Sequence, residues 1–197
     1  MKNNPFPPEL RTAAFVSRWN IMWSNIRSDI AQHSFFAAWY SYMITKVIKW
    51  RGPVDYLLLS ALAHDLGETI TADLIGPAKK HIIDEEKATA WIESKMAERM
   101  GQLWVEYCVA ENNMSDKVFE DVEKITKAAD LLDAVLHLKV EKRLGNTCTE
   151  YADKILMAQL ESKWRELPAD PDMLSETWQT VVLPAIRAHE TEGGKGV

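Results

Sequence analysis

The chain has 197 residues, of which 47% are hydrophobic and 26% charged, a composition typical of a globular protein with a sizeable core. Its formal net charge of −6 at pH 7 argues against a general nucleic-acid-binding surface, because neutralising phosphates requires a basic face. The sequence has no membrane-length apolar stretch and no apolar signal-peptide segment near the N-terminus, so we expect a cytoplasmic protein whose two cysteines, Cys108 and Cys148, are reduced.

Hydrophobic periodicity predicts an all-α chain, and the sequence contains no strand alternation, internal repeat or linker. Helices are expected over residues 7–18, 30–50, 55–66, 79–99, 102–110, 116–144, 147–167 and 172–189. We therefore predict one domain over residues 1–197, with a core over 9–167, a C-terminal helix over 172–189 and a disordered tail over 191–197.

Polar residues and a proline mark some of the expected helix ends. Ser28 or Asp29 is placed to cap the second helix, and Asp55 is placed to cap the third. Thr147 and Glu150 have the spacing of a capping box for the helix that ends before Pro168. In the last helix, a kink is expected near Pro184 because proline lacks the backbone N–H.

An apolar run over residues 57–63 ends in His64 and Asp65, and a further carboxylate, Glu68, follows. A charged aspartate at the end of a buried segment is costly unless another group pairs with it. A divalent cation would pair with this carboxylate and use the neighbouring imidazole as well. Three residues elsewhere in the chain are placed to complete such a site, namely His33, Asp130 and Arg18.

The charges of this group favour a buried metal centre. Two neutral imidazoles (His33 and His64) and two carboxylates (Asp65 and Asp130) around a divalent ion sum to zero. Mixed nitrogen and oxygen ligands suit one ion of Co, Mn, Zn, Fe or Ni better than Ca. Metal binding should fail at low pH, because an imidazole must be neutral to coordinate a metal.

Each of these residues also has a structural interpretation. A single histidine near a helix start, such as His33, is more often hydrogen-bonded than metal-bound, and Asp130 on its apolar helix is either paired or coordinating. Asp133, one turn away, is a competing ligand. His137 lies two turns from Asp130, about 10 Å along the axis, too far to share the ion, so we expect a structural role for it.

The order and spacing of these residues resemble a known family. Residues 32–34, 64–68 and 129–130 are similar to the H…HD…D pattern of the HD-domain metal-dependent phosphohydrolases. Arg18-Trp19 and the pattern over residues 64–79 resemble, more narrowly, the bacterial 5′-deoxynucleotidases of the YfbR type and the related phage dATP triphosphohydrolases. The resemblance extends from about residue 15 to residue 140 and implies a single HD-domain helical bundle. It also implies that His33, His64, Asp65 and Asp130 are the metal ligands.

The resemblance assigns roles to five further residues. Arg18 and Lys79 would bind the phosphate, and Trp19 would pack against the sugar and exclude a ribose 2′-hydroxyl. Glu68 and Asp73 would act as catalytic groups that activate the attacking water or protonate the leaving oxygen. Taken singly, each has an ordinary alternative as a helix-end cation, a core tryptophan, a turn cap or a surface lysine.

The implied activity is hydrolysis of the 5′-phosphate ester of 2′-deoxyribonucleoside monophosphates by a homodimer that binds neither nucleic acid nor membrane. The alternative is a dATP-type triphosphohydrolase, because both reactions cleave at the same phosphorus. A cyclic-nucleotide phosphodiesterase is less favoured, since the interval between the HD pair and Asp130 offers only His81 as a further histidine. The presence of all four presumed ligands and Glu68 argues against an inert HD interaction module.

Overall fold

A computed structural model describes residues 8–20, 22–73, 85–101, 104, 106–108 and 113–191. Within these residues all regular elements are helical, apart from one isolated bridge between Ser17 and Asp29, so the prediction of an all-α chain is confirmed. The elements are η1 (Pro8–Phe15), α1 (Ile30–Val47), α2 (Val54–Ala63), α3 (Glu68–Thr71), α5 (Glu85–Met100), α7 (Asp116–Arg143), η2 (Thr147–Thr149), α8 (Glu150–Arg165), α9 (Pro171–Thr177), η3 (Trp178–Val182) and α10 (Leu183–Thr191).

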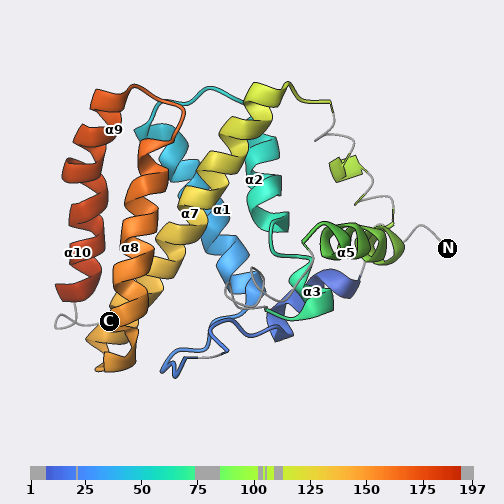
Figure 1. Ribbon diagram of the computed structural model, residues 1–197, viewed down its shortest axis with the longest axis horizontal. Helices are drawn as coiled ribbons and strands as arrows, with labels where there is room; N and C mark the ends of the chain where they lie inside the picture. Colours follow the sequence, from blue (N-terminus) through green and yellow to red (C-terminus); the bar gives the residue numbers. More distant parts are fainter. Residues whose placement is uncertain are drawn as a thin grey trace.

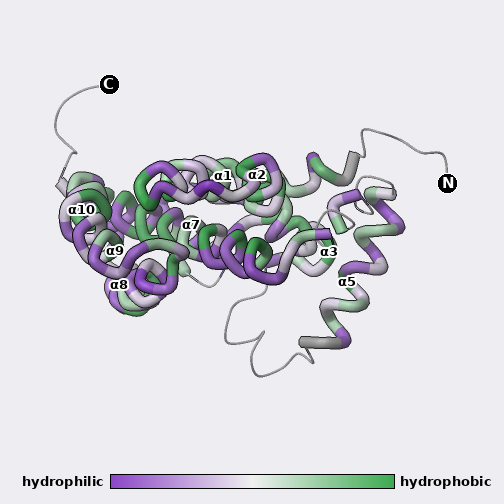
Figure 2. The backbone as a smooth tube through the Cα atoms, turned by 90° about the horizontal axis from the view of Figure 1, so that it is seen from above, coloured by the Kyte–Doolittle hydropathy of each residue, from purple (hydrophilic) through white to green (hydrophobic). Residues whose placement is uncertain are grey.

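Helix α7 is the centre of the bundle. It has 28 residues and packs against α1, α2, α8 and α10 (Figure 1). Seen from above, it lies between α1 and α2 on one side and α8 on the other (Figure 2). Ile125 and Val135 of α7 are fully buried with Leu57 of α2 and Leu160 of α8. Because apolar positions recur along α7 at helical spacing, the helix can bury contacts with several neighbours at once.

A second apolar cluster lies where η1, the start of α1, the end of α2 and α5 meet. It includes Ala13, Ile30, Leu66 and Met96, all at most 9% exposed. Helix α5 lies at the edge of the bundle near α3 (Figure 2). This cluster supports the two segments, before α1 and after α2, that carry the candidate site residues.

Two of the predicted helix caps are wrong. Pro53, not Asp55, occupies the N-cap position of α2, and Asp55 lies in the first turn, where its charge complements the helix dipole. Asn146, not Thr147, provides the cap before α8, because its side chain accepts a hydrogen bond from the backbone N–H of Cys148. Residues 147–149 then form a 3₁₀ turn, which delays the start of α8 to Glu150.

The helix predicted over residues 172–189 is divided into α9, η3 and α10. A π-helical turn, Trp178–Val182, directly precedes the segment that contains Pro184, whose missing N–H interrupts the regular ladder near the expected kink. The predicted first helix is the 3₁₀ helix η1, which ends at Phe15. Residues 79–84, most of the helix predicted over 102–110 and the tail from residue 192 lie outside the described residues.

Among the described helices, none has the length and apolar character needed to cross a bilayer. Cys108 and Cys148 are not joined by a disulfide bond.

Candidate active site

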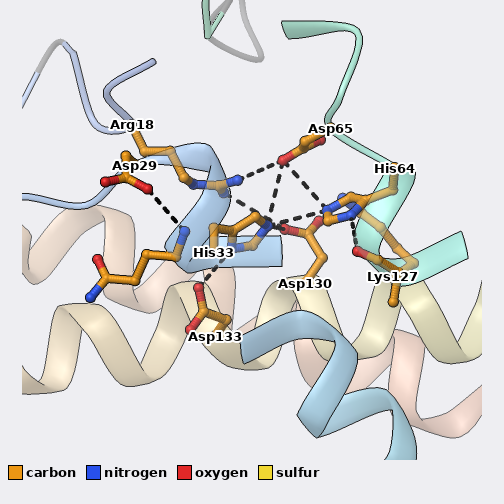
Figure 3. A network of polar contacts seen from close by, with 10 residues as sticks. Arg18, Asp29, His33, His64, Asp65, Lys127, Asp130 and Asp133 are labelled. Carbon is orange, nitrogen blue, oxygen red and sulfur yellow. Dashed lines mark hydrogen bonds and ion pairs between the residues drawn. The ribbon is translucent and has the colours of Figure 1, made fainter. Parts of the chain in front are cut away.

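Side chains from three helical regions meet at one point (Figure 3). His33 lies on the first turns of α1 and is fully buried. His64 and Asp65 follow directly after the last residue of α2, and Asp130 lies in the middle of α7. Helices α1 and α2 both pack on α7, and this packing brings residues 33, 64 and 130 together although they are far apart in the sequence.

The two imidazoles face each other through their Nε2 atoms, which are 3.2 Å apart. The Nδ1 atom of His33 lies 2.6 Å from Asp133 Oδ2, and the Nδ1 atom of His64 lies 2.7 Å from the carbonyl oxygen of Ala61. Both partners only accept hydrogen bonds, so each Nδ1 carries a proton, and a ring that is neutral presents a lone pair at Nε2. Two lone pairs at this distance repel unless a proton or a cation lies between them.

The pKa values of His33 and Asp130 also indicate that this centre stabilises positive charge. Burial by itself lowers the pKa of His33, but hydrogen bonds with Asp130 and Asp133 raise it to about 9. Burial also disfavours ionisation of Asp130, yet its hydrogen bond with His33 and the charge of Lys127 hold the pKa of Asp130 below its usual range. The centre therefore favours a cation between charged carboxylates and imidazole nitrogens.

The spacing of the donor atoms of His33, His64 and Asp130 fits a single metal ion. Ligand atoms about 2.1 Å from one ion are about 3.0 Å apart at a right angle and about 3.4 Å apart at the tetrahedral angle. His33 Nε2 lies 3.2 Å from His64 Nε2 and 3.3 Å from Asp130 Oδ1. Ligand atoms of His33, His64 and Asp130 all lie within 4.8 Å of one another. Asp65 Oδ2 lies 3.5 Å from His33 Nε2 and 3.4 Å from His64 Nε2.

Arg18 lies beside both carboxylates of the cluster (Figure 3). Its Nη1 atom donates a hydrogen bond to Asp65 Oδ2 at 2.7 Å, and its Nη2 atom lies 3.7 Å from Asp130 Oδ1. The other carboxylate oxygen of Asp130 accepts a hydrogen bond from Lys127 at 2.5 Å. The side chain of Arg18 is 15% exposed, and its guanidinium, which has the geometry to bind a phosphate, lies next to the candidate metal-binding atoms.

Trp19 lies flat against His137 of α7, with ring centroids 5.3 Å apart and planes 8° apart. The backbone of Trp19 has φ of +62°, in the left-handed region that side chains other than glycine rarely adopt. Burial lowers the pKa of His137, which favours a neutral ring beneath the indole. The structural role of His137 is therefore to support the indole ring of Trp19.

The remaining predicted residues follow the His64-Asp65 pair in the sequence, and one of them lies outside the described residues. Glu68 is the first residue of α3 and is buried. Asp73 follows α3, and its backbone carbonyl accepts a hydrogen bond from the side chain of Asn20 at 3.4 Å. Lys79 lies outside the described residues. The catalytic roles of Glu68 and Asp73 and the phosphate-binding role of Lys79 remain predictions.

Asp133 has a role that the sequence analysis did not assign. The sequence offered it as a competing metal ligand, whereas in the structure it accepts the Nδ1 proton of His33. A carboxylate in this position fixes the ring orientation of a metal-binding histidine and increases its basicity. The spacing of three residues from Asp130, which places both on one helix face, was the available signal.

A cavity of about 560 Å³ opens beside the cluster, within the size range of small-molecule sites. His64, Asp65 and Asp130 form part of its wall, and the rest comes mainly from α7 and the end of α8. The cluster is thus accessible from a space large enough for a nucleotide-sized ligand.

The fold is similar to that of a solved HD-domain phosphohydrolase. The HD phosphohydrolase DatZ of cyanophage S-2L, solved with dA and one catalytic Zn²⁺ ion, superposes with a TM-score of 0.67. The two are 22% identical, over 91% of this chain and 95% of that chain.

The family model described as "5′-deoxynucleotidase YfbR-like" matches residues 6–170, and the chain belongs to that family. The 5′-deoxynucleotidase of Vibrio atlanticus (strain LGP32) is 26% identical over 170 residues, which cover 83% of this chain and 88% of that protein. The 4′-phosphooxetanocin A phosphatase of Priestia megaterium is 24% identical over 157 residues, which cover 78% and 81% of the two chains. The family resemblance found in the sequence is confirmed.

Proposed function

We propose that this enzyme hydrolyses the 5′-phosphate ester of 2′-deoxyribonucleoside monophosphates and releases a deoxynucleoside and phosphate. The observation that carries the proposal is the meeting of two imidazole Nε2 atoms and two carboxylates beside Arg18, in a member of the YfbR-like family. Related proteins from Vibrio and Shewanella that bear the name 5′-deoxynucleotidase support the same activity.

The residues that would hold the metal are His33, His64, Asp65 and Asp130, and the donor set suits one divalent ion of Co, Mn, Zn, Fe or Ni. Such an ion, when bound, polarises the phosphoryl group and lowers the pKa of water. Arg18 would turn its guanidinium toward the phosphate and neutralise two of its oxygens.

Proton transfer falls to two carboxylates. Glu68 and Asp73 would orient or activate the attacking water or protonate the leaving 5′-oxygen. Lys79 would add a second positive charge at the phosphate.

The selectivity for deoxyribose would come from Trp19. Its indole is backed by the parallel ring of His137 and its backbone is constrained, so the ring forms a firm wall next to Arg18. A sugar packed against this wall leaves little room for a 2′-hydroxyl group.

The charges of the cavity favour a monophosphate over a triphosphate. Two of the lysines that line it are already paired, Lys124 with Glu120 and Lys163 with Glu166. Among the described lining residues, acidic groups also outnumber lysines. A polyphosphate chain would need unpaired cations in this space, since its charge rises with each phosphate.

We also propose a homodimer through the outer face of α1 and α2. Phe35, Trp39 and Leu62 are each exposed by more than two fifths and border an apolar hollow between these helices. Exposed apolar patches of this kind mark interaction surfaces. Sedimentation should show a dimer for the native chain and a monomer for Trp39→Glu, and a monomeric native chain would contradict the proposal.

The test of activity is a substrate panel. Metal-stripped protein is reloaded with Mn²⁺, Co²⁺ or Zn²⁺ and incubated with dNMPs, NMPs and dNTPs, and phosphate and triphosphate are measured separately. We expect phosphate from dNMPs, and release of triphosphate from dNTPs alone would refute the proposal. His64→Ala should abolish turnover.

A matched control is available in His189→Ala. The ring of His189 also has its Nδ1 atom next to a backbone carbonyl, that of Ala185, but it lies in the last turn of α10. Turnover by this variant should equal that of the native enzyme.

A further inference from the structure

A second carboxylate of α7, Glu141, is fully buried and lies outside the metal cluster. Its Oε1 atom accepts hydrogen bonds from Ser24 Oγ at 2.8 Å and from the backbone N–H of Ile26 at 2.7 Å. Its Oε2 atom accepts hydrogen bonds from the backbone N–H of Asn25 at 2.9 Å and from Asn146 Nδ2 at 2.8 Å. Burial opposes ionisation, but these donors lower the pKa of Glu141 to about 2.

Three of these four donors belong to the loop over residues 17–29, which carries Arg18 and Trp19. Asn146 adds a further contact, because its amide also donates to the carbonyl oxygen of Trp23 at 2.7 Å. The far part of the loop is thus bound to the end of α7 and to the turn that follows it.

The base of the same loop is closed separately. The backbone N–H of Arg18 donates a hydrogen bond to the carbonyl oxygen of Ser28 at 2.9 Å, and the backbone N–H of Ile30 donates one to the carbonyl oxygen of Val16 at 3.0 Å. With the base closed on itself, the position of the loop relative to the metal ligands depends on its contacts with α7. Those contacts include the hydrogen bonds of Glu141, the stack of Trp19 on His137 and the ion pair of Arg18 with Asp130 at 3.7 Å. Ser24 Oγ also lies 3.5 Å from His137 Nε2.

The spacing along α7 links these contacts to the metal centre. Asp133, His137 and Glu141 follow one another at intervals of four residues, so they share one face of the helix on successive turns. They contact His33, Trp19 and the 24–26 segment in that order. One helix face therefore sets the orientation of a metal ligand, the sugar wall and the loop between them.

We propose that Glu141 is a positioning residue: by holding the 17–29 loop on α7, it fixes Arg18 and Trp19 relative to the metal ligands and so sets the selectivity for deoxynucleotides. The inference rests on the roles given above to Arg18 and Trp19. Glu141 itself lies under the loop and does not touch the substrate.

The test is Glu141→Gln, which keeps the size of the side chain but removes one acceptor oxygen. The NH₂ group of the amide then faces either Ser24 and Ile26 or Asn25 and Asn146, and the pair that it faces loses its acceptor, so at least one loop hydrogen bond is lost. We expect kcat/KM for dAMP to fall about 10- to 100-fold, because small displacements of positioning groups are costly. The ratio of dAMP to AMP turnover should also fall, while the bound metal stays at the native amount.

A structural readout that needs no substrate accompanies the kinetics. Amide hydrogen exchange should accelerate in Glu141→Gln at whichever of Asn25 and Ile26 faces the new NH₂ group, since that amide loses its buried acceptor. Ser24→Ala, which removes one loop donor and leaves the carboxylate in place, should shift selectivity in the same direction by a smaller factor. It serves as the second variant if Glu141→Gln does not fold.

Lys139→Met is the matched control. Lys139 is a buried charge on the same helix, and it pairs with Asp153 and Glu190 at 2.7 and 2.9 Å, away from the loop. This variant should lose stability but keep the native ratio of dAMP to AMP turnover. If the ratio is native in Glu141→Gln as well, or falls equally in Lys139→Met, the positioning role is overturned.

Failure of the proposed activity is distinguishable from failure of this inference. If the native enzyme does not hydrolyse dAMP, the proposed activity is contradicted, and with it the role of Glu141 in selectivity. Native turnover with an unaltered ratio in Glu141→Gln contradicts only the positioning role. Native exchange rates at Asn25 and Ile26 in that variant contradict the anchoring on which the role depends.

Discussion

Replacement of Asp133 should weaken metal binding without unfolding the chain. The carboxylate accepts the Nδ1 proton of His33 at 2.6 Å, and His33 has no exposed surface through which water could take over. In Asp133→Ala the ring loses both its orientation and the negative charge that makes it a stronger base. Loss of such a partner lowers metal affinity about 10- to 100-fold, or about 1.4 to 2.7 kcal/mol. Asp133→Asn keeps an acceptor oxygen, so its loss should be smaller.

The assay is competition for Zn²⁺ or Co²⁺ against a chromophoric chelator at neutral pH, with a thermal melt of each metal-free protein. The matched control is Asp121→Asn. Asp121 lies on α7, as Asp133 does, about 18 Å away along the helix axis. Its carboxylate accepts a hydrogen bond from the indole N–H of Trp50 at 3.1 Å. The Asp121→Asn variant should therefore keep the native metal affinity. Native affinity in Asp133→Ala would refute the reasoning, because His33 would then not depend on its carboxylate partner.

Three further outcomes are expected. Trp19→Ala should admit ribonucleotides, and an unchanged ratio of dAMP to AMP turnover would contradict the sugar wall. Asp65→Ala should abolish metal binding while circular dichroism still reports native helix content; retained metal would exclude it as a ligand. The pKa of Glu141 is about 2 in the folded chain against an ordinary value of 4.5, so its stabilisation is complete above pH 4.5 and is lost as the pH falls toward 2. The difference in urea midpoint between the native chain and Glu141→Gln should therefore shrink as the pH falls from 4.5 toward 2, and a constant difference over this range would contradict this assignment.

Helix positions could be predicted because apolar periodicity is a local property. The long helix predicted over residues 116–144 is found as Asp116–Arg143, since its buried positions repeat at helical spacing over its whole length. The caps were less predictable, because several polar residues near one helix end can take the same position. Asp55 and Thr147 fitted the cap patterns, but Pro53 and Asn146 occupy those places.

The candidate metal ligands were predicted from a pattern spread over the chain. The roles of Asp133 and Glu141, which hold a ligand and the neighbouring loop in place, were not predicted. Asp130 and Asp133 lie one turn apart on the same helix face, so spacing alone does not tell which faces an ion and which holds a histidine. The partner of Glu141 is the 24–26 segment, more than a hundred residues away in the sequence. Such contacts depend on how α1 and α7 pack, and no local pattern encodes them.

The central claim is that three helical regions hold one catalytic cation. Anomalous diffraction from crystals of the cobalt- or manganese-loaded enzyme tests it most directly. The account predicts one strong peak at coordinating distance from the Nε2 atoms of His33 and His64 and from carboxylate oxygens of Asp65 and Asp130. A peak that lacks either imidazole as a ligand, or no peak at saturating metal, would contradict it.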